Sequence, residues 1–119
     1  MDSTEMDGIN AILALDCSLV AGDFHQEVVG HYRNGGVMVD TSTVPDGFLP
    51  YETGVEHPAY HGGAMIIVGA YATREEALAG QHTWVERLTQ GELPETIEAK
   101  ANCALAIMAG TEGRVFDRE

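Results

Sequence analysis

The stretch AMIIVGAYATREEALAGQHTWVERL, residues 64–88, joins an apolar run directly to a helix-start signal. Its first part, residues 64–72, is nearly continuous in apolar character, which is typical of a strand buried at the centre of a sheet. Thr73 and Glu76 then form a capping box, in which the Thr73 hydroxyl accepts from the Glu76 amide and the Glu76 carboxylate reaches back to the Thr73 amide. The sequence therefore predicts a central strand followed at once by a helix.

The predicted helix has an inward stripe and ends at two helix breakers. Gly91, followed by Pro94, stops it. Gly80 in its interior costs about 1 kcal/mol relative to alanine, so the helix either passes close to a neighbour there or tolerates the cost. The residues expected on the inward stripe are Ala77, Leu78, Gln81, Val85 and Leu88, with Trp84 beside them.

Three more strands are expected upstream of this stretch. Residues 26–44 contain two β-rich runs separated by Asn34-Gly35, a dipeptide that suits a type I′ hairpin turn. A turn at Pro45-Asp46-Gly47 then leads into a third strand that contains Tyr51. Together with the apolar run, these segments predict a four-stranded antiparallel sheet built as a meander of hairpins.

Helices are expected near both ends of the chain. Apolar residues recur at near-helical intervals over residues 9–20 and predict a short amphipathic helix that ends by Gly22. A last helix is expected to open near Pro94 and to run to Ala109. The chain is thus expected to form one α+β domain over residues 1–119, with a short N-terminal helix and two C-terminal helices packed on one face of the sheet.

The bulk composition is that of a soluble globular protein. The chain has 119 residues, of which 45% are hydrophobic and 21% charged. No segment approaches the roughly 18 consecutive apolar residues that a membrane span needs, and the acidic start MDSTEMDG differs from the basic start of a secretory signal. We therefore expect a cytoplasmic protein that is not secreted and in which Cys17 and Cys103 are reduced.

The charge balance is the most extreme feature of the composition. Nineteen acidic residues face six basic ones, which gives a formal net charge of −13. Such a surface repels phosphate, which argues against direct binding of nucleic acid or of an anionic membrane through a broad basic face. The acidic residues either serve solubility or imitate a polyanion that occupies the basic groove of a nucleic-acid-handling protein.

Three segments together resemble a known set of viral proteins. DTSTV (40–44), YET (51–53) and AYATREEALAGQHTWVERL (70–88) resemble a widespread set of small, mostly uncharacterised proteins of tailed bacteriophages and prophages. In that set, a Y-[AS]-T-x-E-E-A-x-x-G-H motif marks the strand-to-helix junction. Here Gln81 separates the glycine from His82, which moves the histidine about 100° around the helix. The resemblance implies a viral origin, a location in the host cytoplasm and a fold, but no activity.

The stretch YETGVEHPAYHGG, residues 51–63, concentrates acids and histidines between two expected strands. Pro58 makes its centre a turn, so His57 and His61 cannot share a helical face as the zinc ligands of metalloproteases do. A loop could still gather His57, His61 and Glu56 or Glu52 around a metal, but a solvated hairpin loop is favoured. No metal and no other cofactor are therefore expected.

Glu52 can be placed in two ways. It alternates with Tyr51 and Thr53, which point to the opposite face of the strand. If those two face the core, Glu52 faces solvent. If the sheet instead has an open concave face, Glu52 could line it with Asp40 and His31 and do acid–base work, although the same pairing is also a common cross-strand contact.

The remaining motifs argue for binding rather than catalysis. The glycine pairs lack the lysine and the following helix of a phosphate-binding loop, and no nucleophile elbow is present. Trp84, with His82, is either part of a stacking surface for a base or a half-buried cover on the sheet.

We expect a non-enzymatic phage accessory protein that binds a host protein, in anti-defence or host takeover. The alternatives are a protein that sequesters a small molecule or nucleotide and a virion component, and homo-oligomerisation is left open. Candidate ligand-binding residues are His31, Tyr51, Glu52, His57, His61 and Trp84, and the candidate acidic interaction surface comprises Glu86, Glu92, Glu95 and Glu98.

Overall fold

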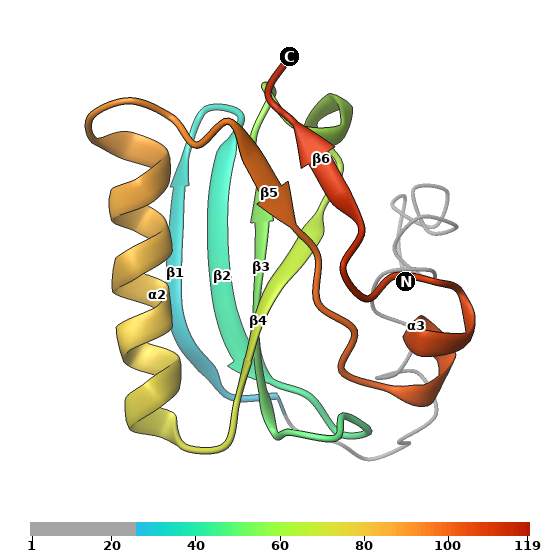
Figure 1. Ribbon diagram of the computed structural model, residues 1–119. Coiled ribbons are helices and arrows are strands. Elements are labelled where there is room, and N and C mark those ends of the chain that lie inside the picture. The colour runs from blue at the N-terminus through green and yellow to red at the C-terminus, as the bar shows by residue number, and fades with distance from the viewer. Residues whose placement is uncertain (1–25) are drawn as a thin grey trace, which may run out of the picture.

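The computed structural model describes residues 26–119, which form an α+β fold on a four-stranded antiparallel sheet (Figure 1). The strands follow one another in chain order, and each pairs antiparallel with the next, so the sheet is the predicted meander. The helix expected within residues 9–22 lies outside the described residues. The four strands are β1 (Val28–Asn34), β2 (Val37–Thr43), β3 (Tyr51–Glu56) and β4 (Ile66–Tyr71).

The first hairpin forms where it was predicted, with its turn shifted by one residue. Asn34 pairs with Val37, so the two loop residues are Gly35 and Gly36. Gly35 has a φ of 61°, a conformation that glycine adopts without steric cost. A glycine at the first loop position is typical of a type II′ turn, rather than the predicted type I′.

The apolar strand β4 lies at the edge of the sheet and not at its centre, so that prediction is wrong. Its apolar character has another cause, because Ile66 and Val68 are buried in the core beneath segments that return from the C-terminal part of the chain. An edge strand that is covered on its face can be as apolar as a central one.

The helix α2 (Arg74–Thr89) begins at the predicted cap. The Thr73 hydroxyl accepts from the Glu76 amide at 3.1 Å, whereas the Glu76 carboxylate accepts from the amide of Ala72, one residue before the predicted partner. The predicted inward stripe is confirmed. Ala77, Gln81 and Leu88 are buried, and Leu78, Trp84 and Val85 are half-buried.

The prediction of a long helix from Pro94 to Ala109 is wrong. In its place the chain forms β5 (Thr96–Glu98) and only a short helix, α3 (Ala104–Met108), before β6 (Val115–Asp117) pairs with β5. Exposure alternates along the segment, because Ile97 is 1% exposed while its neighbours point outward. Burying that side chain in a strand outweighs the helix propensity of the alanine-rich sequence that follows.

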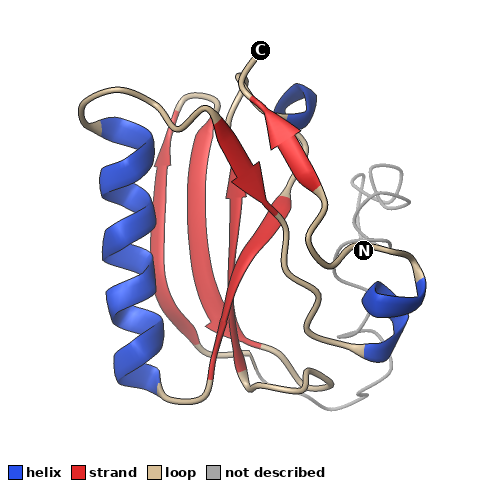
Figure 2. Cartoon of the chain, viewed as in Figure 1, coloured by secondary structure: helices blue, strands red, loops and turns tan. Residues whose placement is uncertain are grey.

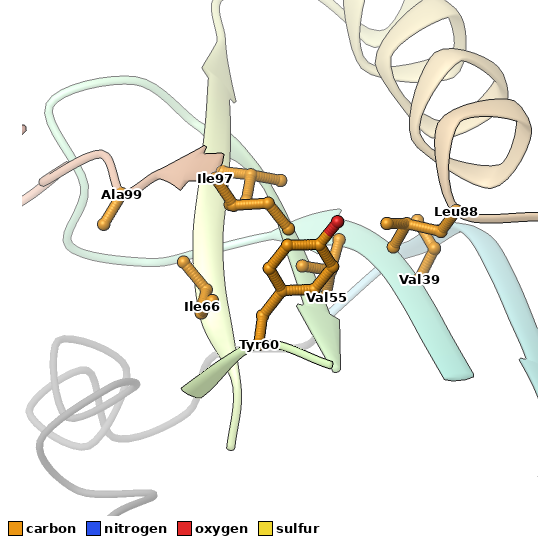
Figure 3. Packing of buried hydrophobic residues seen from close by; sticks show 8 residues of the cluster. Val39, Val55, Tyr60, Ile66, Leu88, Ile97 and Ala99 are labelled. Carbon is orange, nitrogen blue, oxygen red and sulfur yellow. The ribbon is translucent and has the colours of Figure 1, made fainter. Parts of the chain in front are cut away.

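The core lies between one face of the sheet and the segments that cover it. Helix α2 and the two-stranded β5–β6 sheet pack on the same face, and Figures 1 and 2 show both in front of the four-stranded sheet. Tyr60, from the loop after β3, is fully buried and donates its hydroxyl to the carbonyl of Pro94. Figure 3 shows the cluster, which comprises Val39, Val55, Tyr60, Ile66, Val68, Leu88, Ile97 and Ala99.

A tyrosine fills a slot between β4 and α2. The Tyr71 hydroxyl donates to the hydroxyl oxygen of Thr53 at 3.0 Å. A Cβ at Gly80 would lie 2.1 Å from the Tyr71 hydroxyl oxygen, and one at Gly69 would lie 2.2 Å from the same atom. A side chain at either position would displace Tyr71 from this slot, which explains a glycine in the interior of α2.

The state of Cys103 and the length of the helices bear on the expected location of the protein in the host cytoplasm. Cys103 is buried and disulfide-bonded, so the expectation of a reduced thiol at this position is wrong; Cys17 lies outside the described residues. None of the helices within residues 26–119 is long and apolar enough to cross a membrane.

Candidate functional site

A cleft of about 520 Å³ opens along the outer edge of β4. Its volume lies in the range of small-molecule sites. Residues 68–71 of β4 form its floor, and one face of α2 forms one wall through residues spaced three and four apart. The wall on α2 consists of Gly80, Thr83, Trp84 and Arg87, and the facing wall consists of Phe48, Leu49, Lys100, Ala101, Asn102 and Glu112.

An aromatic and a cationic side chain lie together on the α2 wall. The guanidinium carbon of Arg87 lies 4.8 Å from the ring centroid of Trp84, which is a cation–π contact. Trp84 is half-buried and is the only tryptophan of the chain. The cleft therefore presents a planar aromatic surface with a fixed positive charge above it.

The cleft also gathers positive charge in a strongly acidic protein. All six lysine and arginine residues lie within the described part of the chain. Arg33 and Arg74 are each paired with a glutamate, at 3.1 and 3.0 Å. Arg87 and Lys100 line the cleft, and neither forms an ion pair with a carboxylate of residues 26–119. Two charges that could face an anion are thus concentrated at one place.

Glu112 is the single acidic residue among the described residues that line the cleft. Its carboxylate accepts the amide of Ala101 at 2.7 Å, which ties it to the backbone of the same wall. The two cations and this one acid leave the cleft with a formal charge of +1, in a chain whose net charge is −13.

The floor of the cleft offers backbone hydrogen-bonding groups. In an antiparallel strand, successive residues turn these groups alternately toward one neighbour and toward the other. The Thr43 amide donates to the Glu27 carbonyl, so the backbone groups of Thr43 point away from β3. The backbone groups of its β3 partner, Tyr51, therefore point toward β4, where Tyr51 pairs with Tyr71. The N–H and C=O of Ala70 therefore point outward from the sheet, where Ala70 lines the cleft. Neither group has a hydrogen-bond partner within residues 26–119.

A buried amide side chain fixes the second wall. Asn102 is 4% exposed; its Oδ1 accepts from the Leu49 amide and its Nδ2 donates to the Leu49 carbonyl, both at 2.9 Å. Its Nδ2 also donates to Glu52 Oε2 at 2.9 Å. Burial raises the pKa of Glu52, and the bond from Asn102 opposes this shift in part. Glu52 is thus half-buried in a structural contact, rather than facing solvent.

The opposite face of the sheet carries the expected histidine and aspartate. His31 Nδ1 lies 2.9 Å from Asp40 Oδ1, and the Ser42 hydroxyl donates to Asp40 Oδ2 at 3.1 Å. Ser42 shares a face with Asp40 and pairs with Glu52 on the neighbouring strand. His31 pairs with Asp40, so the three predicted residues His31, Asp40 and Glu52 lie on the same face of the sheet. The serine hydroxyl contacts the carboxylate and not the imidazole, so no activated nucleophile is assembled.

The loop between β3 and β4 holds its two histidines in packing contacts. His57 Nδ1 accepts from the Ala59 amide at 3.0 Å, and the His61 ring lies 4.3 Å from that of Phe116. Burial lowers the pKa of His57. Among the described residues, no group of three or more His, Cys, Asp or Glu side chains is arranged to hold a metal ion.

The structure disperses the ligand-binding residues predicted from sequence. Only Trp84 lines the cleft, Tyr51 lies on the face covered by α2, and the others lie on the opposite face or in the loop. Arg87, three residues beyond Trp84 in a predicted helix, could have been found by helical spacing. Lys100 and Ala70 could not have been found in this way. They lie near Trp84 only because of how the strands pair and because the chain returns beside β4 at Lys100.

The predicted acidic surface is only partly assembled. Glu86 and Glu92 line a shallow depression at the C-terminal end of α2. Glu98 lies on β5 and Glu95 precedes that strand, so Glu92, Glu95 and Glu98 do not lie together on the helix that the sequence predicts from Pro94. All four side chains are exposed.

Comparison with known proteins adds no relative: no family model, no curated protein and no solved structure matches the chain.

Proposed function

We propose that the chain is a phage accessory protein that acts by binding a small anionic molecule in the cleft beside Trp84. The observation that carries the proposal is the convergence of Arg87 and Lys100, both free of carboxylate partners among residues 26–119, on a cleft that holds the only tryptophan. The viral setting is supported by the motifs over residues 40–88.

The chemistry of the lining favours binding over catalysis. Its described residues include no histidine and no cysteine, and its one carboxylate, Glu112, is engaged by the Ala101 amide. General acid–base catalysis most often uses a histidine or a free carboxylate, and the described lining offers neither. The cleft offers positive charge, an aromatic surface and backbone groups, which are the features of a binding site.

A thermal-shift experiment tests the proposal. A panel of anions is compared at saturating concentration: inorganic phosphate, benzoate, ribose 5-phosphate and adenosine 5′-monophosphate. A ligand at ten times its Kd stabilises the folded protein by about 1.4 kcal/mol. We expect at least one anion to raise the Tm of the wild-type protein.

The double variant Arg87→Ala/Lys100→Ala should lose this shift. Arg33→Ala also removes a positive charge, but on a residue paired with Glu56 outside the cleft, and should keep it. The proposal is wrong if no anion of the panel shifts the Tm, or if Arg33→Ala abolishes the shift as fully as the cleft variants do.

A second candidate function is the binding of a basic host protein through the acidic surface. The observation that favours it is the exposed pair Glu86 and Glu92 in one depression, which Arg87 also lines, with Glu95 and Glu98 exposed on the following segment. Glu92→Lys with Glu98→Lys should slow association with a partner found by pull-down and flatten its salt dependence, while folding changes little. If association is indifferent to both the reversals and salt, the charge serves solubility alone.

A further inference from the structure

We infer that the ligand of the cleft is a mononucleotide, with its base beside Trp84, the base edge on Ala70 and its phosphate facing Arg87 and Lys100. The inference rests on the proposed function, which requires only a small anion. It adds two features, a planar ring and a hydrogen-bonding edge on that ring.

The aromatic surface is suited to a base. Trp84 is half-buried on one wall, and Phe48 on the other wall remains 62% exposed. A flat ring that enters the cleft can cover both side chains. It can also stack on the guanidinium plane of Arg87, since nucleobases stack on both aromatic rings and arginine.

The floor supplies the groups that would read the edge of a base. The N–H and C=O of Ala70 point outward and lack partners among the described residues. A nucleobase presents donors and acceptors side by side along its edge, so one residue of an edge strand can pair with it.

The same edge does not suit an added peptide strand. Addition of a strand depends on a row of main-chain hydrogen bonds along an open edge. Here the Ile67 carbonyl already accepts from the Lys100 amide at 2.8 Å, and β4 ends at Tyr71. Between Ile67 and Tyr71, only Ala70 offers both a backbone N–H and a C=O that point outward and have no partner among the described residues.

The charge of the cleft limits the number of phosphates. Arg87 and Lys100 oppose one carboxylate, Glu112, which leaves a formal charge of +1. A single phosphate carries a charge of about −1.5 to −2 near neutral pH. A triphosphate would bring more negative charge toward a chain whose net charge is −13, so a mononucleotide is the better match.

The test uses the fluorescence of Trp84, which reports on the cleft without a signal from another tryptophan because it is the only one in the chain. The four common ribonucleoside 5′-monophosphates are titrated into the protein. Three compounds isolate the parts of the ligand: ribose 5-phosphate lacks the ring, phenyl phosphate lacks the base edge and adenosine lacks the phosphate. At least one mononucleotide should quench Trp84 and bind about fivefold or more tightly than each of the three partial ligands.

Two variants separate the contacts. Lys100→Ala should weaken the mononucleotide about tenfold and leave adenosine unchanged. Ala70→Pro removes only an outward N–H, at an edge position where proline is tolerated, and should weaken the mononucleotide without affecting phenyl phosphate. Arg33→Ala should change neither affinity. If Ala70→Pro does not fold, the comparison of mononucleotide with phenyl phosphate in the wild-type protein decides the same point.

The outcomes distinguish this inference from the proposed function. If ribose 5-phosphate or phenyl phosphate binds as tightly as every mononucleotide, and Arg87→Ala/Lys100→Ala abolishes this binding, the cleft is an anion site and the nucleotide inference is wrong. If none of these compounds and no anion of the thermal-shift panel binds, both are wrong.

Discussion

Gly80→Ala is expected to destabilise the protein, although the same substitution in an ordinary helix is stabilising. A Cβ at position 80 would lie 2.1 Å from the hydroxyl oxygen of Tyr71 and 2.4 Å from its ring carbon Cζ. The ring has little room to move toward β4, because its hydroxyl already lies against the backbone of Gly69, where even an added Cβ would be 2.2 Å away. Tyr71 must therefore leave the slot, or α2 must shift away from β4.

The magnitude follows from three contributions. Replacing glycine by alanine in a helix interior stabilises by about 1 kcal/mol. Overpacking a filled site costs about 1–3 kcal/mol. Loss of the hydrogen bond from Tyr71 to Thr53, which measures 3.0 Å, costs about 1 kcal/mol more. The expected net effect is a destabilisation of about 1–3 kcal/mol, or a fall in Tm of roughly 5 °C for each kcal/mol.

Urea unfolding of a double-mutant cycle checks this explanation. In a Tyr71→Val background the ring is absent, so Gly80→Ala should stabilise by about 1 kcal/mol, in line with its helix propensity. The sign of the effect should thus reverse between the two backgrounds. Equal stabilisation in both would refute the slot and would leave the glycine in the helix without a structural reason.

Thr73→Ala should destabilise by about 1 kcal/mol in urea unfolding, because it removes the cap on the Glu76 amide; unchanged stability would contradict the capped helix start. Burial raises the pKa of Glu52 above its ordinary value of 4.5, so the folded protein binds this proton more tightly than the unfolded chain and loses stability as the pH rises through this range. Glu52→Gln, which keeps an acceptor for Asn102, should therefore be more stable than the wild type near pH ~7, with the advantage lost below pH 4.5; a gap that does not depend on pH would exclude this explanation. His57→Ala with His61→Ala should leave the metal content unchanged by elemental analysis and lower stability modestly through lost packing on Phe116, whereas stoichiometric zinc in the wild type alone would establish a metal site.

Much of the fold could be predicted because its signals are local. The cap at Thr73, the glycines of the first hairpin and the inward stripe of α2 each depend on residues close together in sequence. The helix predicted over residues 94–109 failed for the opposite reason. Ile97 is buried by residues of the sheet and by Tyr60, and this distant packing overrides local helix propensity.

The cleft could be predicted only in part. Trp84 was a candidate because its helix was predictable, although the sequence left open whether it forms a stacking surface or a half-buried cover on the sheet. Its partners Lys100 and Ala70 reach the same place through the strand order and through the backbone bond from Lys100 to Ile67, and neither leaves a local signature. The half-buried placement of Glu52 likewise depends on Asn102, which is 50 residues away in the chain.

The meander order of the sheet has a consequence for the sequence of folding events. Each pairing from β1 to β4 joins neighbours in the chain, so it closes a short loop at a small entropic cost. The second wall of the cleft depends instead on Asn102, whose bonds to Leu49 span 53 residues. That wall should therefore join the sheet late in folding and detach first in partial unfolding. A ligand held between the walls would slow this detachment. A ligand with a longer residence time should therefore slow the hydrogen exchange of the Lys100 amide more strongly.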